Sequence, residues 1–168
     1  DLRDERLRYN DGARVTQDQI LIYRKPTPED GVRKKTLQRE PGQIVGQGFH
    51  PFLINNLENL VKGDVISAKL VLPAQMDQFD VRIYKRYIAG SRVSVRIEME
   101  SWFLRLFAPH VDVDYDVNTR QLLAYRGVSV VADESGKSVP VTVSYDYTAE
   151  SIQVSSRSAP PKNGPASN

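Results

Sequence analysis

The chain contains no cysteine, which excludes disulfides, thiolate nucleophiles and cysteine-based zinc sites together. It has no apolar run near the roughly 18 residues of a membrane-spanning helix, so we predict no transmembrane segment. A strong excess of positive or negative residues is also missing. The 23 Lys and Arg residues nearly balance the 21 Asp and Glu residues, and the formal net charge is +2. Nucleic-acid-binding domains usually show a concentrated basic stripe, so we do not expect a nucleic acid as a partner.

Residues for catalysis are scarce as well. There are two histidines, His50 and His110, which are too scattered to form a histidine zinc site by themselves. No G-x-S-x-G nucleophile elbow occurs. We read His50 as a helix cap and His110 as a loop residue, and we predict no catalytic residue, no metal site and no cofactor.

The length of 168 residues suffices for one domain with its own core. We expect a single β-rich domain over residues 1–150. Residues 151–168 are rich in Ser, Pro, Gly and Asn and are predicted to be a disordered tail, because they bury too little to offset the entropy of ordering. Since the chain begins at Asp1 and not at Met, we expect a fragment or a processed product that has lost a signal peptide.

One helix is predicted, over about residues 51–62. Pro51 suits a first helical position, and His50 before it is the expected N-cap. Phe52, Leu53, Leu57, Leu60 and Val61 recur at helical spacing and form one apolar face. Gly63 should end the helix in the left-handed conformation.

Elsewhere the hydrophobic period is two, which is typical of strands. Residues 13–25 and 32–40 flank a Pro- and Asp-Gly-containing turn and are predicted to form a hairpin. After Gly63 no helical stretch intervenes, so the following strands must be antiparallel neighbours. They are expected at residues 64–73, 78–88, 92–101, 110–117, 122–132 and 137–147.

Two hairpins allow a prediction of register, because cross-strand partners share a face. A three-residue loop ending at Gly90 pairs Ile83 with Val95, Val81 with Ile97 and Phe79 with Met99. The opposite face then pairs Arg86 with Arg92, Tyr84 with Ser94 and Arg82 with Arg96. A loop over residues 134–136 likewise pairs Val131 with Val139 and Tyr125 with Tyr145, leaving Arg126 on the outer side.

Asp112, Asp114 and Asp116 alternate along one predicted strand. A calcium loop beginning D-x-D-x-D needs glycine at its sixth position and glutamate at its twelfth, where this chain has Val117 and Leu123. We therefore interpret the three aspartates as the solvated face of a strand. Either register that buries Val113 and Tyr115 places Arg126 opposite Asp112 or Asp114.

Two surfaces are candidates for binding. The basic face of the first hairpin, made of Arg82, Arg86, Arg92 and Arg96, is a candidate site for an anionic group. The stretch "SWFLRLFAP" at residues 101–109 does not alternate as a half-buried strand should. It is either a buried segment or helical turn that plugs the end of the sheet, or an exposed apolar lip that contacts lipid or a partner.

The segment "SWFLRLFAPHVDVDYDVNTRQLLAYRGVSVVADESGKSVPVTVSYDY", with the helix "GFHPFLINNLENLVKGD" before it, resembles a family of uncharacterised exported (periplasmic) bacterial β-sheet proteins. It also has a broad architectural likeness to the lipoprotein-carrier half-barrels of the LolA/LolB type, in which a curved sheet surrounds an apolar cavity. The resemblance implies a bacterial, periplasmic location and supplies no catalytic residues. Architecture alone carries no function with it.

These observations predict a mainly β protein: a curved antiparallel sheet or half-barrel of about 6–8 strands, with one helix packed across its concave face. The first functional hypothesis is a non-catalytic envelope protein that binds an apolar or amphiphilic ligand, such as a lipid, in the concavity. The second is a structural or interaction module with a filled core that meets an envelope protein through the lip or an open strand edge. The third is a hydrolase that uses His110 and a carboxylate. The residues proposed for apolar ligand binding are Phe52, Leu57, Trp102, Phe103 and Phe107.

Overall fold

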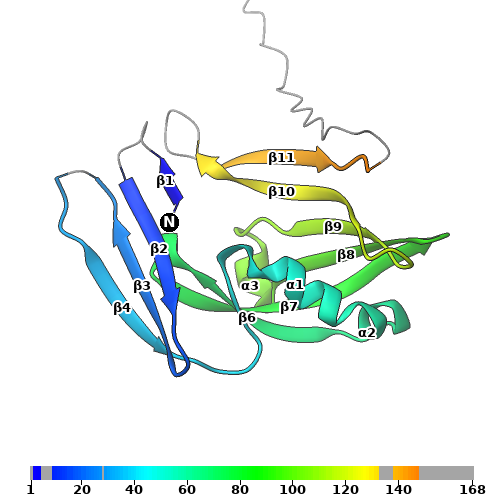
Figure 1. Ribbon diagram of the computed structural model, residues 1–168, viewed down its shortest axis with the longest axis horizontal. Helices are drawn as coiled ribbons and strands as arrows, with labels where there is room; N and C mark the ends of the chain where they lie inside the picture. Colours follow the sequence, from blue (N-terminus) through cyan, green and yellow to red (C-terminus); the bar gives the residue numbers. More distant parts are fainter. Residues whose placement is uncertain (1, 5–8, 28, 133–137, 148–168) are drawn as a thin grey trace, which may run out of the picture.

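The structure is a computed structural model that describes residues 2–4, 9–27, 29–132 and 138–147 (Figure 1). The strands are β1 (Leu2–Asp4), β2 (Tyr9–Val15), β3 (Gln19–Lys25), β4 (Arg33–Gln38), β5 (Gln43–Val45), β6 (Ile66–Leu72), β7 (Asp77–Ala89), β8 (Arg92–Met99), β9 (Val111–Asp116), β10 (Leu122–Ala132) and β11 (Ser138–Ser144). The helices are α1 (Phe49–Asn55), α2 (Leu57–Lys62) and α3 (Trp102–Arg105), with short 3-10 turns η1 (Gly46–Gly48) and η2 (Pro73–Gln75).

The strands form two sheets. A four-stranded antiparallel sheet has the order β1-β2-β3-β4, and a seven-stranded sheet has the order β11-β10-β9-β8-β7-β6-β5. In the larger sheet every pair is antiparallel except β5, which runs parallel to β6. The mainly β prediction is therefore confirmed, and the larger sheet is open, with β11 and β5 at its ends (Figure 1).

The N-terminal part contains more strands than the sequence analysis predicted. The predicted strand at residues 13–25 is divided between β2 and β3, because the Thr16 side chain exchanges hydrogen bonds with Gln19 and closes a tight turn. The predicted pairing of this region with the following strand is confirmed, since β3 pairs antiparallel with β4. Strand β1 and the start of β2 fall in a charged stretch without clear periodicity, so the hydrophobic pattern does not predict them.

The predicted helix is two short helices in place of one. Asn56 interrupts it with φ −108° and ψ 6°, and its Nδ2 donates to the carbonyl of Phe52. The expected end is confirmed, because Gly63 has φ 106°, a left-handed conformation that favours glycine. His50 is not the N-cap: Gly48 holds that position, and His50 lies in the first turn of α1.

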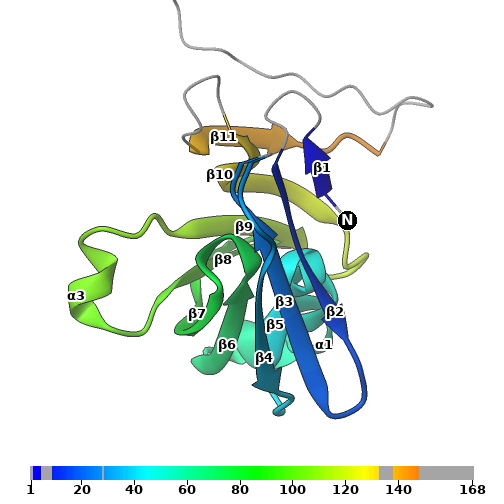
Figure 2. The ribbon, with the colours of Figure 1, turned by 90° about the vertical axis from the view of Figure 1, so that its left-hand side faces the viewer.

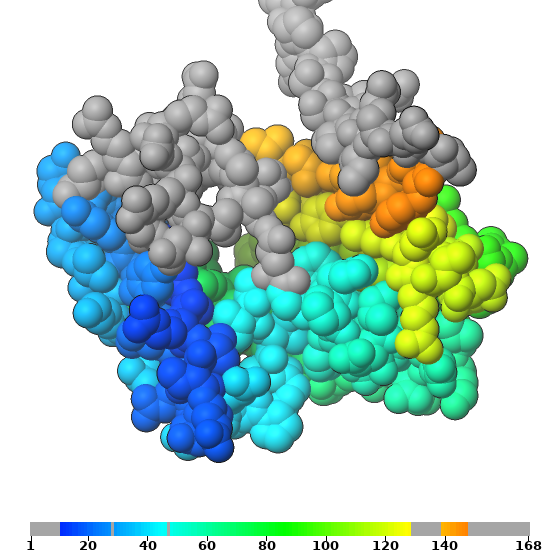
Figure 3. Space-filling model, in the orientation of Figure 1, coloured from blue at the N-terminus to red at the C-terminus, as the bar shows by residue number. Residues whose placement is uncertain are grey.

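The two helices cover one face of the large sheet, as predicted. Figure 3 shows their segment, in cyan, across the middle of the molecule between the N-terminal strands and β10. Leu53, Leu57 and Leu60 are buried there, with Phe52 and Val61 packed against the same core. The sheet contributes the other buried members: Ile44, Ala68, Val81, Ile83, Val93, Val95, Ile97, Val113 and Tyr115.

The predicted register of the β7–β8 hairpin is wrong by two residues. Ile83 pairs with Ile97, Val81 with Met99 and Arg82 with Glu98. The irregularity between Lys85 and Tyr87 adds one residue to β7 near the turn. From Val81 to Lys85 the shift is two, which leaves each side chain on its predicted face. The predicted inner face therefore survives there while the cross-strand partners change.

The β10–β11 hairpin differs in the same way. Tyr125 pairs with Val143 and not with Tyr145, and Gly127 pairs with Val141. The predicted loop at residues 134–136 and the predicted tail at 151–168 lie outside the described residues. The side chain of Val131, predicted to face Val139, also lies outside them.

Candidate functional site

The face of the large sheet that carries α1 and α2, here called the inner face, is where the sequence analysis expected an apolar ligand. Two of the residues proposed for that ligand lie here. Leu57 is buried in the core, and Phe52 is partly buried against it. Both side chains therefore contribute to packing between the helices and the sheet.

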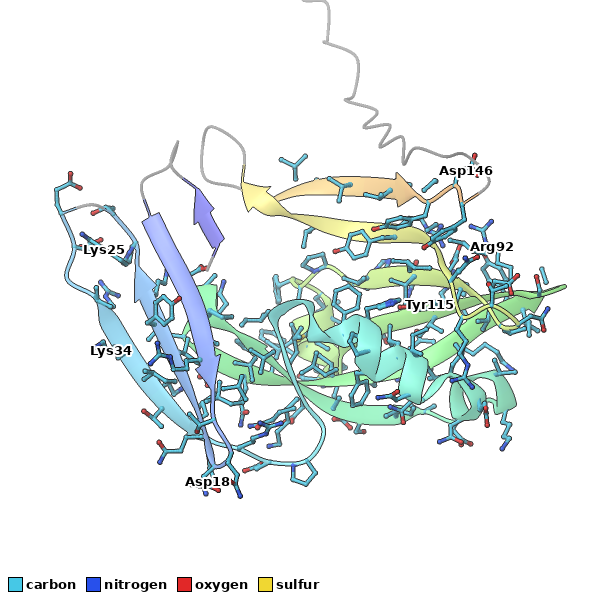
Figure 4. All side chains as sticks on the ribbon, viewed as in Figure 1. Asp18, Lys25, Lys34, Arg92, Tyr115 and Asp146 are labelled. Carbon is cyan, nitrogen blue, oxygen red and sulfur yellow. The ribbon has the colours of Figure 1, made fainter. Side chains whose placement is uncertain are left out.

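A polar contact within this core escaped the sequence analysis. Tyr115 is fully buried and lies on the sheet beside α1 (Figure 4). Its Oη is 2.8 Å from Nδ1 of His50, and the two rings stack with centroids 5.5 Å apart. Burial raises the pKa of Tyr115, so the phenol stays protonated and can donate a hydrogen bond to Nδ1 of His50. This hydrogen bond satisfies a buried hydroxyl and positions α1 on the sheet.

The opposite, outer face carries the alternating aspartates, and the prediction that they are solvated is wrong. Asp114 is 0% exposed and Asp112 is 5% exposed. Asp116 differs, because it accepts hydrogen bonds from the backbone N–H groups of Asn118 and Thr119 in the following turn and from the Ser91 hydroxyl in the β7–β8 turn. Strand alternation assigned these side chains to the correct face but did not indicate what covers them.

Arginines from neighbouring strands cover the two buried aspartates. Asp114 accepts hydrogen bonds from Nη2 of Arg126 at 2.6 Å and from Nε of Arg92 at 2.9 Å. Asp112 accepts two bonds from Arg96, each 2.8 Å long, and one from Arg86 at 3.1 Å. The predicted proximity of Arg126 is confirmed, since it pairs with Asp112 in register and bonds to Asp114.

A third carboxylate belongs to the same network. Glu98 accepts a hydrogen bond from Nε of Arg82 at 2.6 Å and lies 3.8 Å from Nη1 of Arg105. Arg105 also donates to the backbone carbonyl of Glu100 at 3.0 Å. The register correction explains this pairing, because the predicted partner of Arg82 was Arg96 and its actual partner is Glu98.

The network keeps its members ionised. Burial alone raises the pKa of Asp112 and of Asp114, but arginine hydrogen bonds and charges outweigh it, so both pKa values fall below the ordinary 3.8. The same hydrogen bonds raise the pKa values of Arg96 and Arg126. Guanidinium groups therefore occupy these carboxylates. Within the described part of the chain, no group of three or more acidic or histidine side chains is arranged to hold a metal ion.

The arginines lie above the carboxylates and reach solvent. We call Arg82, Arg86, Arg92, Arg96, Arg105 and Arg126 the arginine layer. Six guanidinium groups bind three carboxylates, an excess of three positive charges within the network. The side chains of Arg82, Arg86 and Arg92 are 39–46% exposed. The predicted basic face therefore exists, with its counter-charges buried beneath it.

The stretch predicted to be either a plug or a lip forms α3 and the turn after it. The segment contains a helical turn, as the plug alternative expected. Its apolar side chains are exposed, as the lip alternative expected. Trp102 is 69% exposed and Phe107 is 75% exposed. We call the exposed group the α3 lip, and its members are Trp102, Phe103, Leu104, Leu106 and Phe107. The rings of Phe103 and Phe107 meet edge to face with centroids 5.2 Å apart.

The α3 lip and the arginine layer lie on the same side of the large sheet. Figure 2 shows α3 projecting from the connection between β8 and β9, away from the side on which α1 packs. The ion pair of Arg105 with Glu98 joins α3 to the outer face. Trp102, Phe103 and Phe107 are thus brought together, whereas Phe52 and Leu57 lie across the sheet from them.

Arg105 and Glu98 are site residues that the sequence analysis did not predict. Arg105 is the single charged residue of the apolar stretch at residues 101–109, and Glu98 lies beside no obvious partner in the sequence. A signal for both was present in the strand alternation, because Glu98 shares the parity of Arg92 and Arg96. The correct partner depended on a register that the sequence pattern does not determine.

His110 lies beside this network and gives little support to the hydrolase hypothesis. Its Nε2 is 3.7 Å from Asp112, which is longer than a hydrogen bond. Asp112 also binds Arg86 and Arg96, so its charge is already compensated and it is poorly suited to activate a base.

No protein-family model, no curated protein and no solved structure matches this chain. The resemblance suggested by the sequence therefore stays a prediction. Among the described residues no helix is long and apolar enough to cross a membrane.

Proposed function

We propose that this protein is a non-catalytic attachment module that docks on the interfacial layer of a lipid membrane through the α3 lip. The observation that carries the proposal is the exposure of five large apolar side chains on one projecting connection. Exposed apolar groups that cluster in this way mark a binding surface, whereas single exposed apolar residues do not. Trp and Phe side chains are well suited to the boundary between headgroups and acyl chains.

The position of α3 between two paired strands supports its role as a docking element. The α3 segment connects two neighbouring strands, β8 and β9, whose inner faces are in the core. Its backbone is also held by Arg105, which donates to the carbonyls of Met99 and Glu100. A lip tied to rigid strands loses less conformational entropy when it binds than a free loop would.

The energy of such a contact predicts weak, reversible attachment. Transfer of a partly exposed large apolar side chain contributes about 1 kcal/mol, so five give roughly 5 kcal/mol, an affinity in the range of tenths of a millimolar. An attachment of this strength usually needs a second interaction to hold a protein at a membrane. The bacterial periplasmic location implied by the resemblance is part of this proposal.

The concave inner face remains a second candidate site for an apolar or amphiphilic ligand. The helices' own side chains pack against that face in the described structure, so a ligand there would have to displace them or enter beside them. This requirement makes the α3 lip the better supported of the two sites. Protein contact through the same lip is the other outcome that a binding experiment can reveal.

The single tryptophan makes the proposal directly measurable. Trp102 is the only Trp in the chain, so its fluorescence reports on the α3 lip alone. With vesicles of phosphatidylcholine, we expect the emission to shift to shorter wavelength as the indole leaves water. In the double variant Phe103→Ser/Phe107→Ser, which keeps the reporter, the partition coefficient should fall about tenfold or more.

A matched control separates the lip from general apolar exposure. Val65 is 64% exposed in the connection between α2 and β6, and Val65→Ser should leave the partition coefficient unchanged. Binding by the double variant that equals that of the parent chain would refute the proposal. So would an unshifted Trp102 emission at lipid concentrations that bind the protein.

A further inference from the structure

The arginine layer has donors that its own carboxylates do not use. Each guanidinium carries five N–H donors, while Arg86 and Arg126 each direct one Nη at a buried aspartate. The side chains of Arg86 and Arg126 are 41% and 34% exposed, so part of each is open to solvent above the buried aspartates. Guanidinium groups bind phosphate with bidentate geometry and give up their hydration more readily than ammonium groups do.

The buried carboxylates position these arginines. Asp112 and Asp114 each bind two arginines from different strands, so the guanidinium groups are held at defined places on the sheet. Side chains positioned in advance lose little rotamer entropy on binding an anion. The arrangement is a rigid cationic surface in which three carboxylates compensate half of the six guanidinium charges, with Asp116 opposite Arg92 in register, and not a set of independent flexible cations.

This cationic surface is joined to α3 by the ion pair of Arg105 with Glu98, and α3 projects from the side of the sheet opposite α1 (Figure 2). A membrane with anionic headgroups presents both complementary features, since phosphates lie directly above an apolar layer. We propose that the arginine layer binds the phosphate groups of anionic phospholipids while the α3 lip enters the interface below them. This inference rests on the proposed function and specifies the membrane as an anionic one.

The composition of the lip favours lipid over a nucleic acid of similar charge. Single-stranded nucleic acids stack their bases on open aromatic faces. In the α3 lip, Trp102 and Phe103 meet edge to face, as Phe103 and Phe107 do. Leu104 and Leu106 complete the surface, and aliphatic side chains contribute nothing to stacking. An acyl-chain boundary accepts all five side chains equally.

The redundancy of the network allows a test that should preserve the fold. The triple variant Arg82→Gln/Arg86→Gln/Arg92→Gln removes one arginine from each carboxylate. Glu98, Asp112 and Asp114 then keep Arg105, Arg96 and Arg126, respectively. Circular dichroism and the melting temperature should verify folding before binding is measured.

Partition is measured by Trp102 emission on phosphatidylcholine vesicles and on equimolar phosphatidylcholine–phosphatidylglycerol vesicles at low salt. The parent chain should prefer the anionic vesicles, and the preference should weaken as salt is added. The triple variant should bind anionic vesicles about a hundredfold more weakly, which corresponds to roughly fivefold for each of the three arginines removed. Its binding to neutral vesicles should not change.

A charge-matched control lies on the other sheet. The variant Lys25→Gln/Arg33→Gln/Lys34→Gln removes the same charge from β3 and β4, and Figure 4 shows Lys25 and Lys34 at the far end of the molecule from Arg92. It should bind anionic vesicles nearly as well as the parent chain. An equal loss in both triple variants would overturn the inference, because net charge and not the arginine layer would then be responsible.

The two proposals fail in distinguishable ways. If the parent chain binds neutral and anionic vesicles equally and Phe103→Ser/Phe107→Ser loses both, the headgroup inference is wrong and the proposed function stands. If that double variant binds both as the parent does, the proposed function is wrong and the inference falls with it. Tight binding of a single-stranded oligonucleotide, lost in the triple arginine variant, without any preference for anionic vesicles would overturn the lipid assignment.

Discussion

Asp114 is fully buried, and it stays ionised because Arg92 and Arg126 both bind it. A buried carboxylate without such partners would take up a proton, because desolvation disfavours its charged form. Removing one member of a buried ion pair usually lowers stability by more than the pair contributes, because the remaining partners are left with uncompensated charges. The outer face is therefore sensitive to the loss of a carboxylate in a way that a solvated strand is not.

Asp114→Asn tests this sensitivity. We expect it to lower the free energy of unfolding by about 2–4 kcal/mol in urea denaturation, because two arginines lose the charge that they share. Asp77→Asn is the matched control: Asp77 pairs with Lys35 at the surface, so its loss should cost less than about 1 kcal/mol. Equal, small effects of both substitutions would show that Asp114 behaves as a solvated residue.

The same substitution has an expected pH dependence. The pKa values of Asp112 and Asp114 are lowered in the folded state, so their contribution to stability is present above the unfolded pKa and is lost as pH falls through the folded pKa. The difference in unfolding free energy between the parent chain and Asp114→Asn should therefore shrink below about pH 4. A difference that stays constant down to strongly acidic pH would contradict the lowered pKa of Asp114.

At the scale of elements, the strands show how far hydrophobic alternation leads. It assigned Val81, Ile83 and Val95 to the inner face correctly, because the side-chain period of a strand is two. It did not determine the partners, since registers that differ by two residues place the same side chains on the same faces. The irregularity in β7 between Lys85 and Tyr87 has no signature in this alternation.

Strand β10 contains a close contact that the alternation also does not predict. The ring of Tyr125 lies over Gly127, and its hydroxyl donates to the carbonyl of Val128 at 3.0 Å. A Cβ on Gly127 would lie 2.7 Å from Oη and 2.9 Å from Cζ of Tyr125. The glycine therefore leaves room for an aromatic ring that packs against Phe49 of α1.

Gly127→Ala should displace that ring and destabilise the fold by about 1–3 kcal/mol, the usual effect of overpacking. The measurement is the midpoint of urea unfolding at unchanged slope. Gly31→Ala serves as control, because a Cβ at Gly31 meets nothing within 4 Å, and it should change stability by less than about 0.5 kcal/mol. A neutral Gly127→Ala would mean that Tyr125 can move without loss of packing.

At the scale of the whole molecule, the two sheets meet through a small core of their own. Ile20 and Ile22 of β3 are buried together with Val71 of β6, and Lys35 of β4 also pairs with Asp77 of β7. This core is separate from the larger one under α1 and α2. Because few of the buried residues that the structure describes join the sheets, the four-stranded sheet is expected to open at lower free energy than the seven-stranded one.

Ile22→Ala should enlarge the difference in opening free energy between the two sheets. The substitution is expected to cost about 2–5 kcal/mol locally, and amide hydrogen exchange should quicken in β2, β3 and β4 while β8 and β9 keep their protection. Val32→Ala, at a residue that is 55% exposed, should leave exchange unchanged. A uniform loss of protection across both sheets would indicate one cooperative unit.

The sequence by itself determined which side chains of the strands after Gly63 face inward and where the helical segment that covers the large sheet lies. These properties follow from local periodicity and from residues such as Gly63, whose left-handed conformation ends α2. It also indicated that residues 101–109 depart from the strand pattern. Local patterns of this kind do not depend on which distant segment becomes a neighbour.

Only the tertiary structure decided what the outer face is. Arginines on β7, β8 and β10 cover aspartates on β9, so residues that alternate like a solvated strand are buried. The tertiary structure likewise decided that the apolar stretch projects as a lip beside this surface and does not plug the sheet (Figure 2). The physical reason is that burial and ion pairing depend on the register and on the path of a connection through space, and a single strand's pattern contains neither.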